Sequence, residues 1–246
     1  MFTSALATIS ARLPSTLKLR LRRLRPYYGR ILSSGETVMS VDTRHGNLKW
    51  RLDELTCGGH LTGKYEPYMQ EAIHEFLRPQ MVVYDVGAHA GFHTLFCALK
   101  AHQTVSFEPH PSNRASIERQ INLNSALNIR LLPYALSDKN GPGVLAEPSN
   151  SSMAYVSSDG SIPIELRTID SLVAEGVPPP DLIKVDVEGH ELNVLRGCAK
   201  TIERYRPIIL CDPNDESTAQ SISNMLTAFN YEVTGMLPIV CLPREL

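Results

Sequence analysis

Residues 81–91 constrain the fold of this chain more than any other stretch. An apolar, β-branched run ends in Asp85 and is followed by a glycine turn at Gly87, and the next apolar run ends in Glu108. A strand, a glycine turn, a helix and a second strand closed by a carboxylate form the layout of a nucleoside-binding βαβ unit. We expect Gly87 to form the turn beside the ligand, because a glycine leaves room for a close approach to the backbone.

The second residue after Gly87 indicates which nucleoside fits. A dinucleotide fingerprint needs a further glycine there, so that the backbone can approach a pyrophosphate. This chain has His89, whose ring would crowd that approach. The turn therefore suits a ligand with a ribose and no pyrophosphate, such as S-adenosylmethionine (SAM). We expect Glu108 to accept hydrogen bonds from the ribose hydroxyls, and Asp85 and Gly87 to face the methionine end.

Composition fits a globular enzyme kept in a reducing compartment, which we expect to be the cytoplasm. The chain has 246 residues, 43% of them hydrophobic, and no apolar run of eighteen or more residues. Its five cysteines are scattered and form no C-x-x-C pair, so a zinc site or a disulfide framework is not expected. Four of them have apolar neighbours and are predicted to be buried thiols: Cys97, Cys198, Cys211 and Cys241.

Charge is divided unevenly along the chain. Residues 1–35 carry seven basic side chains and no acidic one. Taking these from the 24 basic and 26 acidic side chains leaves 17 against 26, a net charge of −9 for the remainder. So acidic a domain is a poor match to a phosphate backbone, which argues against a nucleic-acid substrate.

The basic segment 1–35 allows three interpretations. Its leucines follow helical spacing with cations between them, which fits an amphipathic helix packed on the domain. The same pattern fits a helix on a membrane surface, which would make the protein peripheral to the membrane. An Arg- and Ser-rich segment without acids also fits an organelle-targeting sequence.

Residues 36–80 and 81–246 form the other two predicted units. The first contains a hairpin, with strands at 37–42 and 47–52, a flexible connection at 57–60 and a helix over 66–77 that caps the ligand pocket. The second alternates strands and helices, which predicts an α/β, doubly wound, mainly parallel sheet. We expect strands at 81–86, 104–108, 128–134, 181–187 and 207–211, helices at 90–100, 111–126, 190–199 and 216–229, hairpin-like excursions over 140–167, and an antiparallel edge hairpin at 231–234 and 238–241.

The block 181–191 supplies the candidate catalytic groups. Alternate residues share one face of a strand, so Lys184, Asp186 and Glu188 should align, with Lys184 below and paired to Asp186. In an open α/β sheet the ligand crevice lies beyond the carboxyl ends of the strands, which places Asp186, Glu188 and His190 at the reaction site. His190 is the best candidate base by its ordinary pKa. Asp186 or Glu188 can serve if burial raises its pKa.

A metal-assisted variant stays open beside the metal-free one. Asp186 and Asp212 end strands at the same sheet edge, and two carboxylates there can hold Mg²⁺. We rank it second, because Asp212 can also cap the turn that follows it.

With these pieces in place, the chain resembles the FkbM-type SAM-dependent methyltransferases over roughly residues 66–235. The resemblance rests on the order of short motifs at 83–91, 107–111, 121–124, 135–138, 168–172, 183–191 and 206–210. It implies a class I methyltransferase fold of the Rossmann-like type and O-methylation of a hydroxyl on a glycan, a glycolipid or a natural product. Within the motifs we place the cofactor site at Asp85, Gly87, Ala88, His89, Gly91, Glu108, Pro109, Ala135 and Asp138.

Two positions depart from the family pattern. His89 stands where the family more often has a small or amide residue, which leaves open how the methionine end is held. Asp212 stands where glutamate is usual, which shortens a carboxylate and keeps its charge.

Two other classes of function remain beside the methyltransferase. An NAD-linked oxidoreductase shares the sheet, but His89 and the terminal hairpin speak against it. A methyltransferase-like binding protein without catalysis is disfavoured by the acidic and glycine positions that are present. We expect the contacts to the acceptor to come from 140–167 and from the N-terminal segment.

Overall fold

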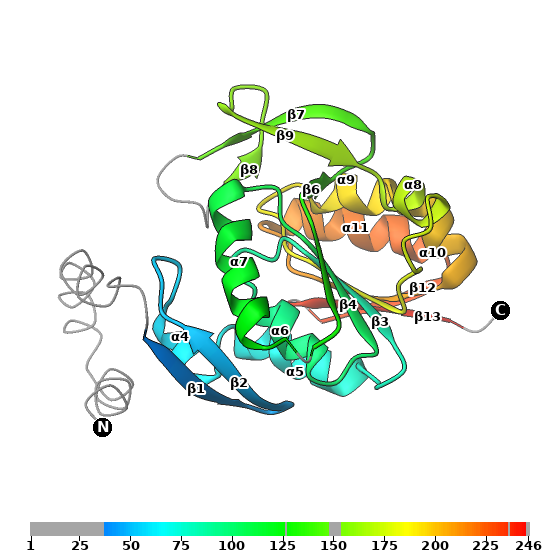
Figure 1. Ribbon diagram of the computed structural model, residues 1–246. Helices are drawn as coiled ribbons and strands as arrows, with labels where there is room; N and C mark the ends of the chain where they lie inside the picture. Colours follow the sequence, from blue (N-terminus) through cyan, green and yellow to red (C-terminus); the bar gives the residue numbers. More distant parts are fainter. Residues whose placement is uncertain (1–36, 126, 148–153, 236, 245–246) are drawn as a thin grey trace.

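The computed structural model describes residues 37–125, 127–147, 154–235 and 237–244, and its centre is a seven-stranded sheet (Figure 1). The strand order is β12–β13–β11–β10–β3–β4–β5. Neighbouring strands from β11 to β5 run parallel, whereas β13 is antiparallel to β11 and β12 to β13. This arrangement confirms the predicted doubly wound sheet and its edge hairpin. The strands are β3 (Val82–Val86), β4 (Gln103–Phe107), β5 (Ile129–Leu132), β10 (Leu182–Val185), β11 (Ile208–Cys211), β12 (Tyr231–Thr234) and β13 (Ile239–Pro243).

Both faces of this sheet are covered, which explains why its strands are almost continuously apolar. Along β3, Val83 packs on one face, and Tyr84 and Val86 pack on the other. The Val83 face is covered by α5 (Pro67–Phe76), α6 (Phe92–Ala98) and the hairpin of β1 (Val38–Thr43) and β2 (Gly46–Arg51), and α7 (Pro111–Leu123) packs beside β2. The Tyr84 face is covered by α8 (Ile169–Ala174), α9 (Glu191–Arg196), α10 (Ala199–Tyr205) and α11 (Glu216–Ala228).

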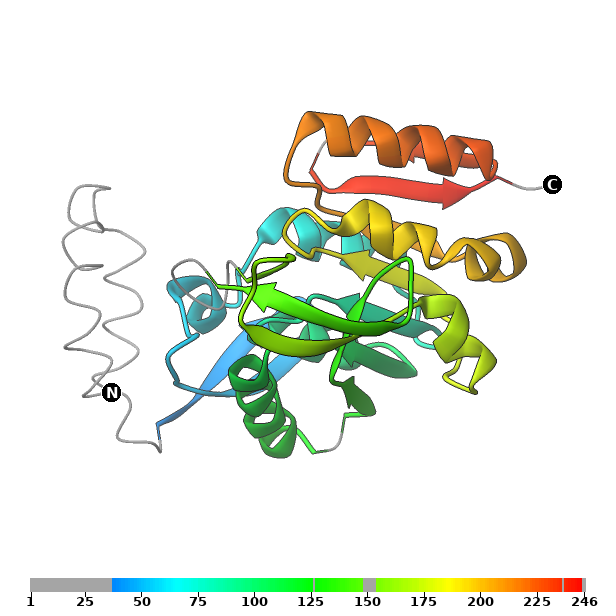
Figure 2. The same ribbon diagram turned by 90° about the horizontal axis from the view of Figure 1, so that it is seen from above.

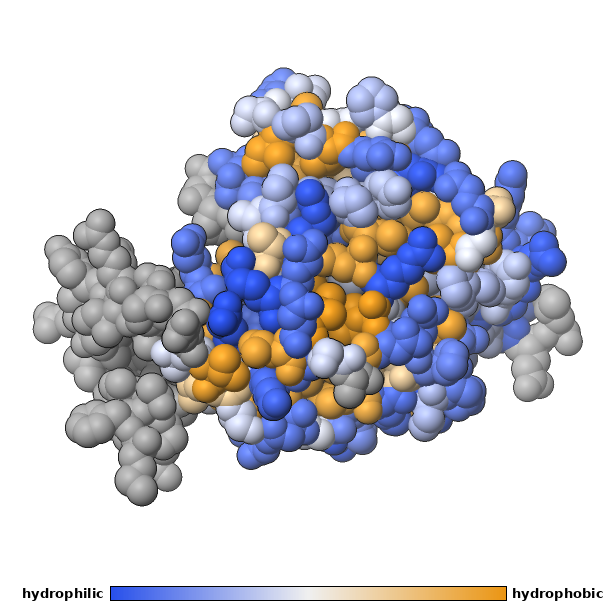
Figure 3. Space-filling view, viewed as in Figure 1, coloured by the Kyte–Doolittle hydropathy of each residue, from blue (hydrophilic) through white to orange (hydrophobic). Residues whose placement is uncertain are grey.

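A second, four-stranded sheet has the order β6–β9–β7–β8 and stands above the central sheet in Figure 1. It consists of β6 (Tyr134–Leu136), β7 (Gly141–Ala146), β8 (Tyr155–Val156) and β9 (Ile162–Arg167). The antiparallel pairs β7–β9 and β7–β8 confirm the predicted excursions over 140–167. Seen from above, the small sheet lies across the centre of the molecule, with α11 and β13 at one side (Figure 2). Figure 3 shows apolar surface across the middle of the face seen in Figure 1, framed by hydrophilic side chains.

The predicted strand over 128–134 is wrong in extent, because the chain changes sheets within it. β5 ends at Leu132, and β6 begins at Tyr134 and pairs with β9. Pro133 lies between them and has no N–H to donate to a neighbouring strand, so the ladder is interrupted there.

The helix predicted over 190–199 is two helices, α9 and α10, separated near Gly197. The carbonyl oxygen of Ser137 lies 1.9 Å from the position that a Cβ on Gly197 would occupy. The chain therefore passes against the end of β6 at this point, which only a glycine permits.

Two short helices were missed by the sequence prediction. The segment 57–60 is not a flexible connection, because α4 (Gly58–Thr62) begins there and the Cys57 N–H donates to His60 Nδ1 at 3.1 Å. The second is α8, whose first turn is capped by Thr168, with Oγ1 accepting from the Ser171 N–H at 3.0 Å. The helix predicted over 66–77 is confirmed as α5.

Two further predictions concern the chain as a whole. All four cysteines expected to be buried are buried free thiols, as predicted. The interpretations of the basic segment 1–35 lie outside the described residues. In the part of the chain that the structure describes, no helix is both long and apolar enough to cross a membrane.

Candidate active site

The register of the central sheet brings four predicted residues together. Val86 pairs with Phe107 on one side and with Val185 on the other, and Val185 pairs with Cys211. The next residue along each of these four strands is Gly87, Glu108, Asp186 or Asp212. All four line one cavity of about 490 Å³ at the carboxyl ends of the strands, where the strand order reverses between β3 and β10.

Gly87 lies directly against the backbone of Asp186, the residue that follows β10. Its φ is +80°, and the Asp186 carbonyl oxygen lies 1.9 Å from where a Cβ would be. The N–H groups of Gly87 and Ala88 donate to the Phe107 carbonyl at 3.1 and 3.2 Å. The glycine therefore lets the ends of β3, β4 and β10 meet, a role beyond the ligand approach that the sequence suggested.

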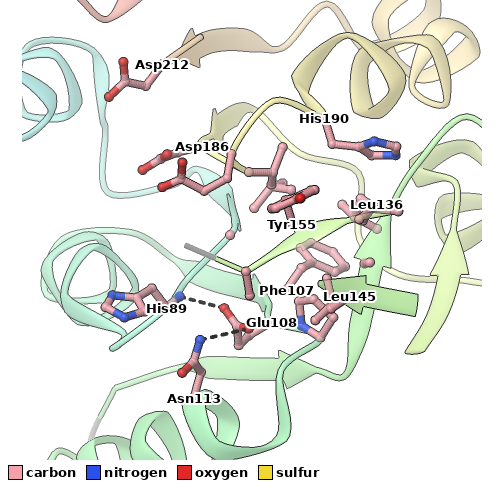
Figure 4. Close-up of a pocket in the computed structure, with 18 of the residues that line it drawn as sticks. His89, Phe107, Glu108, Asn113, Leu136, Leu145, Tyr155, Asp186, His190 and Asp212 are labelled. Atoms are coloured by element: carbon pink, nitrogen blue, oxygen red, sulfur yellow. Dashed lines mark hydrogen bonds between the residues drawn. The ribbon is translucent and has the colours of Figure 1, made fainter. Parts of the chain in front are cut away.

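Glu108 is a buried carboxylate whose position is fixed by the backbone around it. Its Oε2 accepts from the His89 N–H at 2.8 Å, and its Oε1 accepts from Asn113 Nδ2 at 3.3 Å (Figure 4). Oε1 also accepts from the His110 N–H at 2.8 Å. Burial raises the pKa of Glu108 to about 7, although these hydrogen bonds act in the opposite direction. Only 5% of the residue is exposed, yet it lines the cavity, so it is a fixed acceptor aimed at whatever the cavity holds.

His89 also lines the cavity, with a backbone φ of +49°. Burial lowers its pKa to about 4, so the ring is neutral near pH 7. Its Nε2 atom is buried and has no hydrogen-bond partner among the described residues. A buried polar atom of this kind is satisfied when a ligand fills the cavity.

Beneath the cavity, Lys184 joins two of the predicted acids. Its Nζ lies 3.2 Å from Asp85 Oδ1 and 3.4 Å from Asp186 Oδ2, and it donates to the Gly87 carbonyl at 3.0 Å. Burial opposes the charge of Lys184, but Asp85 and Asp186 raise its pKa above the ordinary value. The predicted Lys184–Asp186 ion pair is confirmed, and Asp85 is the stronger, fully buried partner.

Four predicted cofactor residues do not line the cavity. Asp85 is buried below it, where it accepts from Thr94 Oγ1 at 2.6 Å. Gly91 precedes α6 with its backbone against Ile117, and Ala88 is buried in the turn between. Asp138 accepts from Ser137 Oγ at 3.2 Å. The other predicted cofactor residues do line it: Gly87, His89, Glu108, Pro109 and Ala135.

The cavity has two chemically different ends. The apolar end consists of Phe107, Pro109, Tyr134, Ala135, Leu136, Leu145, Tyr155 and Val156, six of them contributed by strands of the small sheet. The acidic end consists of Glu66, Asp186, Glu188 and Asp212. Figure 4 shows Asp186 and Asp212 on one side of the view, Leu136, Leu145 and Tyr155 on the other, and Glu108 below them.

Glu66 is the main residue of this site that the sequence analysis missed. It comes immediately before α5, with a φ of +43°, and burial, followed by the nearby charge of Asp186, raises its pKa to about 6. Its neighbours Tyr65 and Tyr68 line the cavity too, so the prediction that the 66–77 segment caps the pocket is confirmed. In the sequence, the feature that could have indicated Glu66 is its position directly before Pro67, at the start of a predicted helix.

The remaining acids have partners around them. Asp212 accepts from the Tyr68 hydroxyl at 2.8 Å, and Glu188 accepts from Asn214 Nδ2 at 3.3 Å. Burial first, and then nearby acids including Asp186, raise the pKa of both carboxyls. β10 ends at Val185, so Glu188 reaches the cavity through a turn with a φ of +54°, and the predicted strand over 181–187 is too long.

His190 lines the cavity but is held by its neighbours. Its Nε2 lies 2.9 Å from Ser137 Oγ, and its Nδ1 lies 3.2 Å from Asn193 Nδ2. Burial lowers its pKa. Both ring nitrogens are thus engaged within the protein, which makes His190 a weaker proton acceptor than its ordinary pKa suggested.

The described residues contain no group of three or more His, Cys, Asp or Glu side chains arranged to hold a metal ion. Asp186 and Asp212 are therefore a pair of carboxylates without a third protein ligand of those types among the described residues.

Comparison with known proteins identifies the family. The methyltransferase FkbM domain matches residues 85–233, more than half of the chain. The chain belongs to the FkbM methyltransferase family. This decides between the two predicted nucleoside-binding classes in favour of the methyltransferase and against the NAD-linked oxidoreductase.

Two curated relatives and one solved structure support the assignment. Hexuronic acid methyltransferase AglP of Haloferax volcanii is 34% identical over 155 residues, 59% of this chain and 64% of AglP. 2-O-methyltransferase NoeI of Sinorhizobium fredii is 30% identical over 152 residues, 52% of this chain and 62% of NoeI. The chain thus spans less than two thirds of either relative.

The solved structure is that of methyltransferase FkbM from Methylobacillus flagellatus. It aligns with a TM-score of 0.52 at 18% identity, covering 75% of this chain and 52% of that one. At this identity the likeness shows the fold, which is the class I methyltransferase fold predicted from the sequence.

Proposed function

We propose that this protein is a SAM-dependent O-methyltransferase that acts on a hydroxyl of a glycan or a similar polyol. The observation that carries the proposal is the Glu108 carboxylate, fixed by two backbone N–H groups and exposed only to the cavity of an FkbM-family domain. A carboxylate so placed suits the two hydroxyls of a ribose. The names of the two relatives, one a hexuronic acid methyltransferase and one a 2-O-methyltransferase, support a sugar as acceptor.

The lining residues fit SAM. Glu108 would hold the ribose, the apolar end would take the purine, and the turn at Gly87 and His89 would lie toward the methionine end. The unpartnered Nε2 of His89 is a group that a polar ligand satisfies. The acidic end suits the positive charge of a sulfonium. When bound, SAM supplies an electrophilic methyl group, whose bond to sulfur breaks as its bond to the acceptor oxygen forms.

The chain must align the hydroxyl and take its proton. Glu66 is the best matched base, because a pKa of about 6 leaves it ionised at neutral pH while keeping it a useful proton acceptor. Asp186 is the second candidate, and its ion pair with Lys184 holds it in place. Glu188 and His190 then shape the site and position the acceptor. A mechanism assisted by Mg²⁺ at Asp186 and Asp212 ranks below this metal-free one, because the Tyr68 hydroxyl already donates a hydrogen bond to Asp212.

Three accompanying proposals concern the surroundings of the enzyme. The buried free thiols support a reducing compartment, and we assign the protein to the cytoplasm. The basic segment 1–35 remains a candidate for peripheral membrane contact. The acidic remainder of the chain disfavours a nucleic-acid acceptor.

Calorimetry with SAM and with NAD⁺ tests the cofactor, and a turnover assay with labelled SAM tests catalysis. We expect SAM binding and no detectable NAD⁺ binding. Glu108→Ala should weaken SAM binding by about ten- to a hundredfold, as expected for losing hydrogen bonds to a charged group. Unchanged SAM affinity in a folded Glu108→Ala variant would remove Glu108 from the site. Binding without turnover would favour the inactive, methyltransferase-like binding protein.

A further inference from the structure

Among the described residues, the acidic end of the cavity has no Lys or Arg in its lining. Four carboxylates from three segments line it, and no Lys or Arg from the described part of the chain lines the rest of the cavity. The segment 148–153 contains no Lys or Arg in its sequence, and the seven basic residues of segment 1–35 lie outside the described residues. Among the described residues this end therefore presents four carboxylates to an acceptor, and SAM, when bound, sets only the single charge of its sulfonium against them.

Lys184 does not supply the missing charge to an acceptor. It is 2% exposed, does not line the cavity, and lies between the carboxylates of Asp85 and Asp186. Its single positive charge is thus shared by two acids before any ligand enters. Glu66, Glu188 and Asp212 have no Lys or Arg at ion-pair distance among the described residues, and Lys184 acts on them only from further away. His93, which lies 3.6 Å from Glu66, is neutral because burial lowers its pKa to about 3.

The hydrogen-bonding capacity of this end points the same way. An ionised carboxylate only accepts hydrogen bonds, so a row of them needs a ligand rich in donors. Sugar hydroxyls are donors, whereas the carboxylate of a hexuronic acid is an acceptor at neutral pH. Three side-chain donors nearby are already directed at these acids: Tyr65 at Glu66, Tyr68 at Asp212 and Asn214 at Glu188.

The chemistry of transfer adds a third argument. A carboxylate nucleophile carries no proton to remove, so it needs no base, whereas a hydroxyl does. The half-buried carboxyl of Glu66, with its pKa raised to about 6 by burial and by Asp186, is a proton acceptor of the kind that a hydroxyl requires.

From these observations we infer that the acceptor is an uncharged, hydroxyl-rich sugar residue and that hexuronic acids are rejected by the acidic end. The inference rests on the proposed function and adds the charge of its substrate. It separates this chain from its Haloferax relative, whose name gives a hexuronic acid as the acceptor.

Acceptors that have the same shape and differ in charge test whether the charge of the acceptor decides turnover. The full chain, including residues 1–36, is assayed with labelled SAM and the methyl glycosides of glucose, galactose and mannose, each beside its hexuronic acid and its uncharged hexuronamide. We expect the hexose and the hexuronamide of at least one set to be methylated with a kcat/KM about tenfold or more above that of the hexuronic acid, because unbalanced like charges oppose binding.

Two variants test whether the acidic end causes the discrimination. Asp212→Asn removes a charge there while keeping the shape, so it should raise the ratio of hexuronic acid to hexuronamide turnover several-fold. Glu232→Gln removes an exposed charge on the edge strand β12, outside the cavity, and should leave that ratio unchanged. An unchanged ratio in Asp212→Asn, with the wild-type preference intact, would overturn the role of the acidic end.

Three other outcomes would overturn the inference: a hexuronic acid methylated as well as its amide, methyl transferred to the carboxylate and recovered as a base-labile ester, or no transfer to any neutral glycoside by an enzyme that binds SAM. Failure to bind SAM in calorimetry would instead contradict the proposed function, so the two failures are distinguishable.

Discussion

The carbonyl oxygen of Asp186 occupies the space that a Cβ atom on Gly87 would need, with only 1.9 Å between the two positions. This contact joins the turn after β3 to the end of β10. The cofactor turn and the proposed reaction site therefore depend on the same glycine.

Gly87→Ala should destabilise the fold and weaken SAM binding, because the new methyl group collides with the β10 backbone and φ is +80°. Strain at positive φ alone costs about 1–2 kcal/mol. Gly176→Ala is the matched control, since Gly176 has a φ of +96° and open space around it. Urea unfolding should show a larger loss of unfolding free energy for Gly87→Ala. Equal losses in the two variants would mean that the contact with Asp186 relaxes without cost.

Lys184→Met should lower the free energy of unfolding by about 3–5 kcal/mol, because it leaves the buried carboxylate of Asp85 without its cation. Adding Asp85→Asn removes that charge and should recover part of the loss. Thermal or urea unfolding of the two variants measures both effects. A double variant no more stable than the single one would contradict the assigned pairing.

Glu108 should make the stability of the ligand-free protein depend on pH. Burial raises its pKa from an ordinary 4.5 to about 7, so the folded state holds the proton more tightly than the unfolded state. Stability from this group is therefore fully present below about pH 4.5 and is lost as the pH rises to about 7, by about 3 kcal/mol in total.

Comparison with Glu108→Gln isolates this effect from groups such as His89, whose lowered pKa acts in the opposite direction. The difference in unfolding free energy between the two proteins should change with pH between about 4.5 and 7 and be flat above. A difference that is constant across the whole range would show that Glu108 ionises normally.

Glu66 should control the pH dependence of turnover. Only its ionised form accepts a proton, so kcat should rise with pH up to about 6 and level off above it. Glu66→Gln should lower kcat by about a hundredfold and remove this limb of the profile. Glu75→Gln changes an exposed acid on the same helix and should leave the profile intact. If Glu66→Gln keeps the wild-type profile, Asp186 becomes the leading candidate, and Asp186→Asn should then show the loss.

The ends of β3, β4 and β11 could be predicted to within one residue, because apolar runs followed by Gly87, Glu108 and Asp212 reflect local rules for parallel sheets, whereas the predicted end of β10 lay beyond Val185. These residues lie close together because neighbouring strands are parallel and end at the same level of the sheet. The alternation of strands and helices predicts this parallel arrangement. The Lys184–Asp186 pair was accessible for the same reason, since alternate residues of a strand share a face.

Other features depend on contacts between distant parts of the chain. The need for a glycine at position 197 is visible only once Ser137 is placed against it. The pKa of Glu66 is raised by burial and then by Asp186, a residue far along the sequence. His190 looked like a free base until the structure placed Ser137 and Asn193 at its ring nitrogens.

The origin of the two ends of the cavity has an evolutionary consequence. Glu66 and its tyrosine neighbours precede the family-matched region 85–233, whereas Gly87, Glu108 and the whole of the apolar end lie within it. The proposed ribose anchor thus lies within the family domain, and part of the wall around the proposed acceptor site comes from a segment in front of it. Exchange of that short segment between homologues gives a route by which acceptor choice can diverge while the methyl donor stays the same.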